Sequence, residues 1–201
     1  MTSPGPALRV VGIGGTTRPG SLTERALRQA LEHLETDGAT VRLFSGSMLA
    51  KLPMYAPERY DRVSLARALV SELSIADAVV LASPGYHGGV SGLVKNALDY
   101  AEDLRDRDRP YLSGLPVGCI ATGAGWQGVV ATLMQLRAIV HALRGWPTPL
   151  GVTINTTKTR CGSDGRFADQ QTALALEMLA SELREFPRCH AGTVPAMALE
   201  D

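Results

Sequence analysis

The sequence contains little cysteine, few aromatic residues and no net charge. Its three cysteines, Cys119, Cys161 and Cys189, are widely spaced and form no C-x-x-C pair. This excludes a disulfide framework and a zinc site of the usual pattern, and the four histidines add no ligand pattern, so we expect no metal site. Lys plus Arg and Asp plus Glu number 20 each. A net charge of zero gives no sign of nucleic acid or an anionic membrane as partner, and it argues against a strongly acidic electron carrier.

The sequence also lacks a targeting signal and a long apolar segment. The N-terminal residues MTSPGP contain neither a basic region nor an apolar core, so we expect no signal peptide. The uncharged stretch between Arg109 and Arg137 is interrupted by Pro116 and several glycines, which indicates a strand, a loop and a helix rather than a membrane span. The composition, 45% hydrophobic over 201 residues, and the unpaired cysteines predict a cytoplasmic protein with one full core.

Apolar runs alternate with amphipathic segments five times along the chain. We predict strands at residues 10–14, 40–44, 78–82, 115–121 and 150–154, and helices at 22–34, 63–76, 90–101, 129–143 and 169–186. This alternation is typical of one doubly wound α/β domain, which we expect over residues 1–186, with a disordered tail at 187–201. Because a dinucleotide fingerprint is absent, we favour the flavodoxin-like order 2-1-3-4-5 for five parallel strands, with helices on both faces.

A loop rich in glycine and hydroxyl groups follows the first predicted strand. It reads GGTTRPGS over residues 14–21 and leads into a helix whose N-cap is Ser21 or Thr23. Free backbone N–H groups and the positive end of the helix dipole make such a loop a site for phosphate. Arg18 can add a bidentate, charge-assisted contact. The alternative is a tight turn that binds no ligand.

Two familiar phosphate-binding patterns do not fit this loop. Gly15 and Gly20 have the spacing of a P-loop, but Ser21 stands where that pattern requires lysine, which disfavours a nucleotide triphosphatase. The dinucleotide pattern G-x-G-x-x-G begins at residue 12 and fails at Thr17. The remaining interpretation is a monophosphate bound by hydroxyls, backbone N–H groups and one arginine.

Two further loops are rich in turn residues. The sequence SPGYHGG over residues 83–89 follows the third predicted strand, and TGAGWQG over residues 122–128 follows the fourth. In the order 2-1-3-4-5, the carboxyl ends of strands one, three and four meet at the switch point, where ligands bind. We therefore predict one ligand site formed by three loops.

The three loops carry patterns that occur together in one known family. Residues 15–23 match G-S-x-R-x-x-S-x-N, with Thr16 and Thr23 in place of the serine and the asparagine. Residues 84–99 match P-x-Y-N-G-x-x-x-G-x-L-K-N-x-L-D, with His87 in place of the asparagine and Gly85 where an acidic residue is usual. Residues 122–137 are similar to the glycine-rich turn and L-R helix that follow. Over about residues 8–145, the chain resembles the NADPH-dependent FMN reductase family.

The resemblance implies a binding role for each loop. The first holds the FMN phosphate, the second lines the edge of the isoalloxazine ring, and the third approaches the other side of the ring. The implied cofactor-binding residues are Thr16, Arg18, Ser21, Leu22 and Thr23, then Pro84, Gly85, Tyr86, His87 and Gly88, then Thr122, Gly123, Ala124 and Gly125. The resemblance also implies a homodimer or a dimer of dimers, formed through the predicted helices at 90–101 and 129–143.

Some of these positions have two interpretations. Lys95 and Asp99 lie either at the dimer contact or in a simple i, i+4 surface salt bridge. We expect Tyr86, among glycines at a strand end, to face a ligand rather than the core. His87 either donates a hydrogen bond to the flavin or caps the helix that follows. Trp126 either flanks the flavin or the substrate, or has an interface or packing role.

The resemblance implies an NAD(P)H-dependent FMN reductase, which transfers hydride from NADPH or NADH to FMN and supplies reduced flavin to a monooxygenase. The chemistry belongs to the cofactor, so we predict no catalytic side chain. One alternative is an enzyme that keeps FMN bound and reduces a quinone, an azo dye or a metal oxyanion. An alternative of another class is a flavodoxin-type electron carrier, which the neutral composition and the long second pattern disfavour.

Overall fold

Five parallel strands form the centre of the molecule. The computed structural model describes residues 7–190, with side chains up to residue 186. The strands β1 (Arg9–Gly14), β2 (Thr40–Ser45), β3 (Ala78–Tyr86), β5 (Pro116–Gly123) and β6 (Trp146–Asn155) lie in the order β2-β1-β3-β5-β6. Counted along the chain without the short β4, this is the predicted order 2-1-3-4-5, so the flavodoxin-like arrangement is confirmed. The two-residue strand β4 (Gly89–Val90) pairs antiparallel with the end of β3; two residues are too few to show a period in the sequence.

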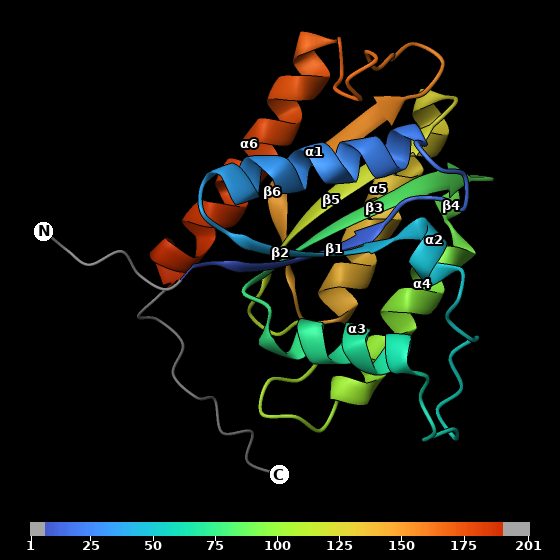
Figure 1. Ribbon diagram of the computed structural model, residues 1–201, viewed down its shortest axis with the longest axis vertical. Coiled ribbons are helices and arrows are strands. Elements are labelled where there is room, and N and C mark those ends of the chain that lie inside the picture. The colour runs from blue at the N-terminus through green and yellow to red at the C-terminus, as the bar shows by residue number, and fades with distance from the viewer. Residues whose placement is uncertain (1–6, 191–201) are drawn as a thin grey trace, which may run out of the picture.

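Helices cover both faces of the sheet (Figure 1). α1 (Leu22–Thr36) and α6 (Gln170–His190) pack on one face, and α3 (Ser64–Ile75), α4 (Gly92–Asp99) and α5 (Trp126–Ala142) pack on the other. A short helix, α2 (Gly46–Leu49), follows β2, and a 3-10 helix, η1 (Tyr100–Leu104), continues α4. A parallel sheet covered in this way is buried on both sides, which explains its nearly continuous apolar strands.

The core consists of one apolar layer on each side of the sheet. Along β3, Val79 and Leu81 face the layer of α3, α4 and α5, whereas Val80 and Ala82 face the layer of α1 and α6. All four residues are fully buried. The alternation follows from the two-residue period of a strand, and it fixes the position of the carboxyl end of β3 between the helical layers.

The ends of two helices decide two of the predictions. The hydroxyl of Ser21 accepts a hydrogen bond from the N–H of Glu24 at 3.3 Å, so Ser21 is the N-cap of α1 and Thr23 lies inside the helix. α6 runs through Pro187 to His190, so the predicted helix end at Phe186 was four residues short. That prediction rested on the small and polar character of the chain from residue 187 onward, and the first four of these residues still continue the helix. Residues 191–201, the rest of the predicted tail, lie outside the described residues.

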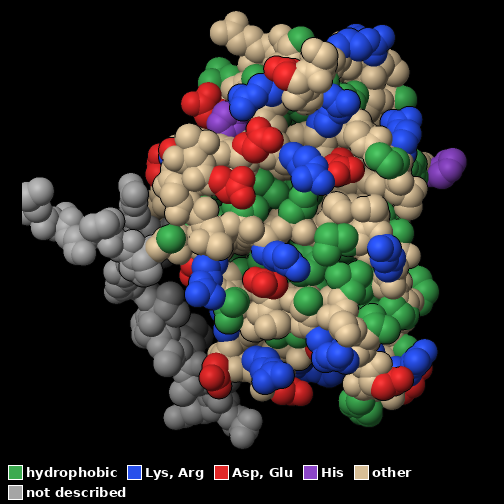
Figure 2. Space-filling model, in the orientation of Figure 1, with side chains coloured by type: hydrophobic (Ala, Val, Ile, Leu, Met, Phe, Trp, Pro, Cys, Tyr) green, Lys and Arg blue, Asp and Glu red, His purple; other side chains and the backbone are tan. Residues whose placement is uncertain are grey.

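The surface carries both charge signs in mixture. On the face drawn in Figure 2, Lys and Arg side chains are interspersed with Asp and Glu side chains. This mixture agrees with the equal numbers of basic and acidic residues in the sequence. Within residues 7–190, none of the helices combines the length and the apolar character needed to cross a membrane.

Candidate functional site at the carboxyl edge of the sheet

The three loops lie at the carboxyl edge of three neighbouring strands. In the register of the sheet, Gly14 of β1 is the partner of Ala82 in β3, and Pro84 of β3 is the partner of Thr122 in β5. A Cβ atom on Gly14 would lie 2.1 Å from the carbonyl oxygen of Ala82. Glycine therefore allows the first loop to approach the end of β3. The fold brings together the three segments from which the sequence predicted one site.

A buried hydrogen bond joins the first and third loops. The hydroxyl oxygens of Thr23 and Thr122 are 2.6 Å apart, and the two residues are 3% and 1% exposed. One hydroxyl donates and the other accepts, so the pair keeps one proton for a further acceptor. The bond holds the start of α1 against the end of β5, and it sets the spacing between the first loop and the third loop.

The first loop is closed on itself by Thr16. Its hydroxyl donates to the carbonyl oxygen of Arg18 at 3.1 Å and accepts from the N–H of Arg18 at 3.2 Å. This is a local turn of the kind that serine and threonine often make. The hydroxyl proton of Thr16 is therefore used inside the loop, and the turn shapes the backbone that leads to α1.

Several hydrogen-bond donors at the first loop and the start of α1 have no acceptor within the described part of the chain. The side chain of Arg18 is exposed and has no partner among the described residues. The N–H groups of Leu22 and Thr23, at the start of α1, have no acceptor there either, and Ser21 keeps its hydroxyl proton because its oxygen accepts from Glu24. A set that contains only donors at the positive end of a helix fits a phosphate monoester such as that of FMN.

The second loop is shorter than the sequence indicated. β3 continues to Tyr86, so Pro84, Gly85 and Tyr86 belong to the strand and only His87 and Gly88 form the turn. The φ angles of His87 and Gly88 are 53° and 80°, and two positive values are the mark of the tight type I′ hairpin. Beyond the apolar run, Ser83 and Pro84 still pair with β5, and the short pairing with β4 extends the strand through Gly85 and Tyr86.

The hairpin decides the orientation of two predicted residues. Tyr86 is 59% exposed, so it faces away from the core as predicted. The N-cap of α4 is Ser91, whose hydroxyl accepts from the N–H of Val94 at 3.3 Å. His87 therefore does not cap that helix, and it lies exposed at the tip of the hairpin.

The third loop leaves its backbone open. The carbonyl oxygen of Gly123 accepts from the N–H of Thr156 at 2.8 Å, which ties the loop to the segment after β6. Ala124 and Gly125 are exposed, and Gly125 is the N-cap of α5 without a side-chain hydrogen bond. Trp126, the first residue of α5, is 50% exposed. A flat ligand can approach this backbone without a clash with side chains.

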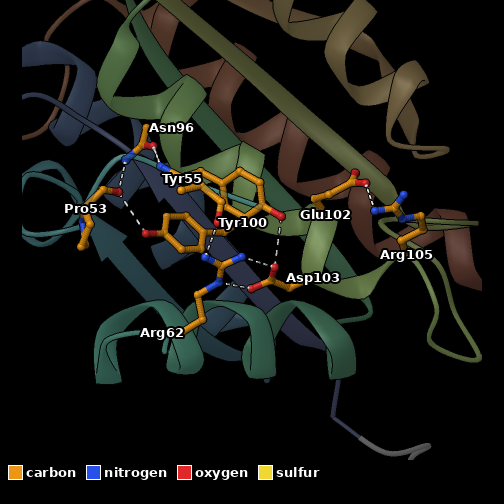
Figure 3. Close-up of polar contacts among 9 residues, drawn as sticks. Pro53, Tyr55, Arg62, Asn96, Tyr100, Glu102, Asp103 and Arg105 are labelled. Atoms are coloured by element: carbon orange, nitrogen blue, oxygen red, sulfur yellow. Dashed lines mark hydrogen bonds and ion pairs between the residues drawn. The ribbon is translucent and has the colours of Figure 1, made fainter. Parts of the chain in front are cut away.

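A second polar region lies where the segment after α2 meets α4 and η1, and it has a different character (Figure 3). We call it the anchor cluster, and it consists of Pro53, Tyr55, Arg62, Asn96, Tyr100 and Asp103. Asn96, part of the second sequence pattern, accepts from the N–H of Tyr55 at 2.8 Å and donates to the carbonyl of Pro53 at 2.9 Å. Asn96 thus fastens the segment after α2 to helix α4.

Arg62 is the centre of the anchor cluster. Its guanidinium donates twice to the carboxylate of Asp103, at 2.7 and 2.8 Å, and lies 4.6 Å from the ring centre of Tyr55 and 5.5 Å from that of Tyr100. The hydrogen bonds from Arg62 hold the pKa of Asp103 below its ordinary value, and burial is the main cause that raises the pKa of Tyr55. The charges of Arg62 and Asp103 are paired with each other, so the anchor cluster stabilises the fold rather than binding a ligand.

Cavity size alone does not locate the site. A cavity of about 820 Å³ lies between α3 and the segment 103–109, lined mainly by charged and polar side chains and by no residue of the three loops. The described residues contain no group of three His, Cys, Asp or Glu that could hold a metal. Cys119 is fully buried in β5, and burial raises the pKa of its thiol to about 12, so it remains protonated and unreactive.

The fold is that of a flavodoxin-like α/β protein, with three glycine-rich loops at the carboxyl edge of its sheet. The chain belongs to the NADPH-dependent FMN reductase family, whose model matches residues 8–159. Its members are oxidoreductases that use FMN and NAD(P)H, so the family, the enzyme class and the cofactors predicted from the sequence are confirmed. This membership sets aside the alternative of a non-enzymatic electron carrier.

Relatives with known names are similar over nearly the whole chain. An NAD(P)H-dependent FMN reductase of Pseudomonas aeruginosa is 29% identical over 190 residues, which cover 88% of this chain and 97% of the relative. An FMN-dependent NADPH-azoreductase of Staphylococcus saprophyticus is 29% identical over 188 residues, covering 87% and 92%. Among solved structures, the NAD(P)H:(acceptor) oxidoreductase FerB of Paracoccus denitrificans has a TM-score of 0.76 at 20% identity, covering 92% and 99%. The flavodoxin-like WrbA-like protein of Agrobacterium tumefaciens has a TM-score of 0.60 at 18% identity, covering 90% and 99%. The structural matches support the fold.

Proposed function

We propose that the three loops bind FMN and that NADPH or NADH delivers hydride to it from the open side of the site. The observation that carries this proposal is the set of unpartnered donors at Arg18 and the start of α1, beside two loops with exposed backbone. Bound FMN supplies the hydride-accepting ring. The protein supplies position, hydrogen bonds and shielding from water.

Each loop has a separate task in this proposal. Arg18, Ser21 and the N–H groups of Leu22 and Thr23 bind the phosphate. The backbone of residues 84–88 borders one edge of the ring, with Tyr86 and His87 exposed beside it. The backbone of residues 122–125 lies on the other side. No side chain is required as an acid or a base, so binding geometry sets the rate.

The proposal is tested with purified protein by its visible spectrum, an FMN titration and the oxidation of NADPH and NADH. We expect flavin absorption bands, or NAD(P)H oxidation that depends on added FMN. A colourless protein that neither binds FMN nor consumes NAD(P)H would mean that the loops hold a different phosphate, and the functional assignment would fall.

A second candidate is a reductase that keeps FMN bound and passes electrons to an azo dye, a quinone or a metal oxyanion. The observation in its favour is the similarity to proteins named FMN-dependent NADPH-azoreductase. The two candidates differ in flavin exchange. Flavin that survives gel filtration and reduces an added azo dye supports the second candidate, whereas flavin that is lost supports the supply of reduced FMN to a monooxygenase.

We also propose a homodimer or a dimer of dimers through α4 and α5. Two apolar side chains of α5, Val130 and Met134, are 48% and 60% exposed, and they lie one turn apart on one face of the helix. Light scattering is expected to show a dimer or tetramer, and Met134→Glu is expected to shift it toward monomer. A monomeric wild type would contradict this contact. The cytoplasmic location remains a prediction from the sequence.

A further inference from the structure

A separate cavity lies at the outer edge of β6, beside the third loop. Its volume is about 440 Å³, within the range of about 300–1,000 Å³ that is usual for small-molecule sites. It lies between β6 and the starts of α5 and α6, and its lining includes Trp126, Val152, Lys158 and Thr159. None of the fourteen residues predicted to bind FMN lines it. The cavity therefore lies outside the predicted FMN site.

One polar side chain that lines the cavity has no hydrogen-bond partner among the described residues. Thr159 is 8% exposed, and its hydroxyl makes no hydrogen bond with any described residue. Its hydroxyl oxygen is not one of the buried polar atoms that lack a partner, so solvent reaches it. Because Thr159 lines the cavity, its hydroxyl is available to a polar atom of a ligand.

Charge and aromatic surface narrow the chemistry of that ligand. Lys158 is the one cation among the described residues that line the cavity, and its ammonium group has no ion-pair partner there. The carboxylate of Asp169 also lines the cavity, but it accepts hydrogen bonds from the N–H and hydroxyl of Thr172 at 3.0 and 2.5 Å. The half-exposed ring of Trp126 offers a stacking surface. An aromatic ring that carries an anionic group fits these features.

The cavity lies directly beside the third loop. Asn155 pairs with Gly123 in the register of β5 and β6, and the N–H of Thr156 donates to the carbonyl of Gly123 at 2.8 Å. Trp126 follows Gly125 immediately in the chain. A molecule with one ring at the third loop can therefore extend over Trp126 into the cavity.

We propose that this cavity binds the adenosine phosphate half of NADPH or NADH, with Lys158 on a phosphate group, Thr159 on a polar atom of the same half and Trp126 against the adenine. This assignment rests on the proposed function, because it extends the hydride donor from the flavin site. It adds Lys158 and Thr159, which the three sequence patterns do not contain, and it gives Trp126 of the third pattern a role in binding the hydride donor. In this proposal the nicotinamide half of NAD(P)H lies at the flavin site and the adenosine half lies in the cavity. A substitution in the cavity can therefore weaken binding of NAD(P)H without weakening binding of FMN.

The test compares two hydride donors in the enzyme saturated with FMN. Reduced nicotinamide mononucleotide lacks the adenosine half, whereas NADPH has it. Lys158→Gln is expected to raise the KM for NADPH about tenfold, the loss of one charge-assisted phosphate contact, and to leave the KM for the mononucleotide and the FMN dissociation constant unchanged. Thr159→Val is expected to act in the same direction with a smaller factor. Lys51→Gln is the matched control, because Lys51 is exposed and lies outside the cavity.

A binding measurement keeps the inference independent of activity. Calorimetry with 2′,5′-ADP is expected to show binding to the wild type and weaker binding to Lys158→Gln. Absence of binding, an unchanged KM for NADPH, or an equal rise for both donors would overturn the inference. A rise in KM only for a sulfonated azo dye would assign the cavity to an anionic electron acceptor and would also overturn it. If 2′,5′-ADP binds but NAD(P)H is not oxidised, the proposed function fails while the cavity assignment stands.

Discussion

The anchor cluster and the first loop differ in whether their arginine has a partner. In the anchor cluster, the guanidinium of Arg62 is satisfied by Asp103 and two tyrosine rings, and its side chain is only 13% exposed. At the first loop, Arg18 is exposed and has no partner among the described residues. A satisfied charge contributes to the stability of the fold, whereas an unsatisfied charge beside a helix start is available for a ligand. The difference separates residues that hold the fold from residues that bind.

The largest effect on stability is expected at the anchor cluster. Arg62→Ala removes two hydrogen bonds to a carboxylate and two ring contacts, so we expect a loss of about 2 kcal/mol in the free energy of unfolding. Urea unfolding measures it. The control Arg59→Ala breaks an ion pair whose side chains are 64% and 76% exposed, and it should cost less than about 0.5 kcal/mol. Equal losses of unfolding free energy in the two variants would contradict a stabilising role of the anchor cluster.

Arg18→Ala is expected to show the reverse pattern. We expect FMN affinity to fall at least about tenfold, which is about 1.4 kcal/mol, with no measurable loss of stability. Fluorescence titration and urea unfolding together measure the two quantities. Arg28→Ala is the control. Arg28 carries the same charge as Arg18 but lies on α1, where it pairs with Glu24 at 2.8 Å. Loss of stability without loss of FMN affinity would show that Arg18 stabilises the fold and does not bind the phosphate.

The buried hydrogen bond between Thr23 and Thr122 is expected to contribute less to stability than the anchor cluster and more than Arg18. Thr23→Val leaves the hydroxyl of Thr122 buried without its partner, and we expect a loss of about 1 kcal/mol. The double variant with Thr122→Val should cost less than the sum of the single variants, since it removes both polar groups. Urea unfolding of the three variants gives this coupling energy. Additive losses would show that the two threonines act separately.

The stability contributed by Asp103 is expected to depend on pH. Arg62 lowers the pKa of this carboxyl in the folded state, so the stabilisation is complete above the ordinary carboxyl pKa of about 3.9 and is lost as the pH falls through the lowered value. Asp103→Asn lacks this titration. The stability difference between wild type and Asp103→Asn should therefore shrink between about pH 5 and pH 2. A constant difference would contradict the cause assigned to the pKa shift.

The smallest effect is expected for the pair on α4. The Nζ of Lys95 lies 2.5 Å from the Oδ1 of Asp99, with side chains 50% and 40% exposed. If the pair is a surface salt bridge, Lys95→Ala costs about 0.3–0.5 kcal/mol in unfolding and leaves the oligomer intact. Dissociation of the oligomer in light scattering would instead place the pair at the dimer contact.

The sequence predicted the parts of this molecule that are encoded locally. The apolar run 78–82 predicted a strand, which the structure shows to be fully buried, and Ser21 was one of two predicted caps. Contacts between distant residues were not predictable, because no period or motif records them. Arg62 and Asp103 are 41 residues apart and Thr23 and Thr122 are 99 apart. The extension of β3 to Tyr86 was missed for a similar reason, since it depends on pairing with two residues of β4.

Comparison of FMN with riboflavin tests the central claim most directly, because riboflavin lacks the phosphate that the first loop is proposed to bind. The dissociation constants of both flavins are measured for the wild type and for Arg18→Ala. We expect the wild type to bind FMN at least about tenfold more tightly than riboflavin, and the substitution to weaken FMN alone. Equal affinity of the wild type for the two flavins, or an equal loss for both in the variant, would contradict the assignment of the first loop as the phosphate site.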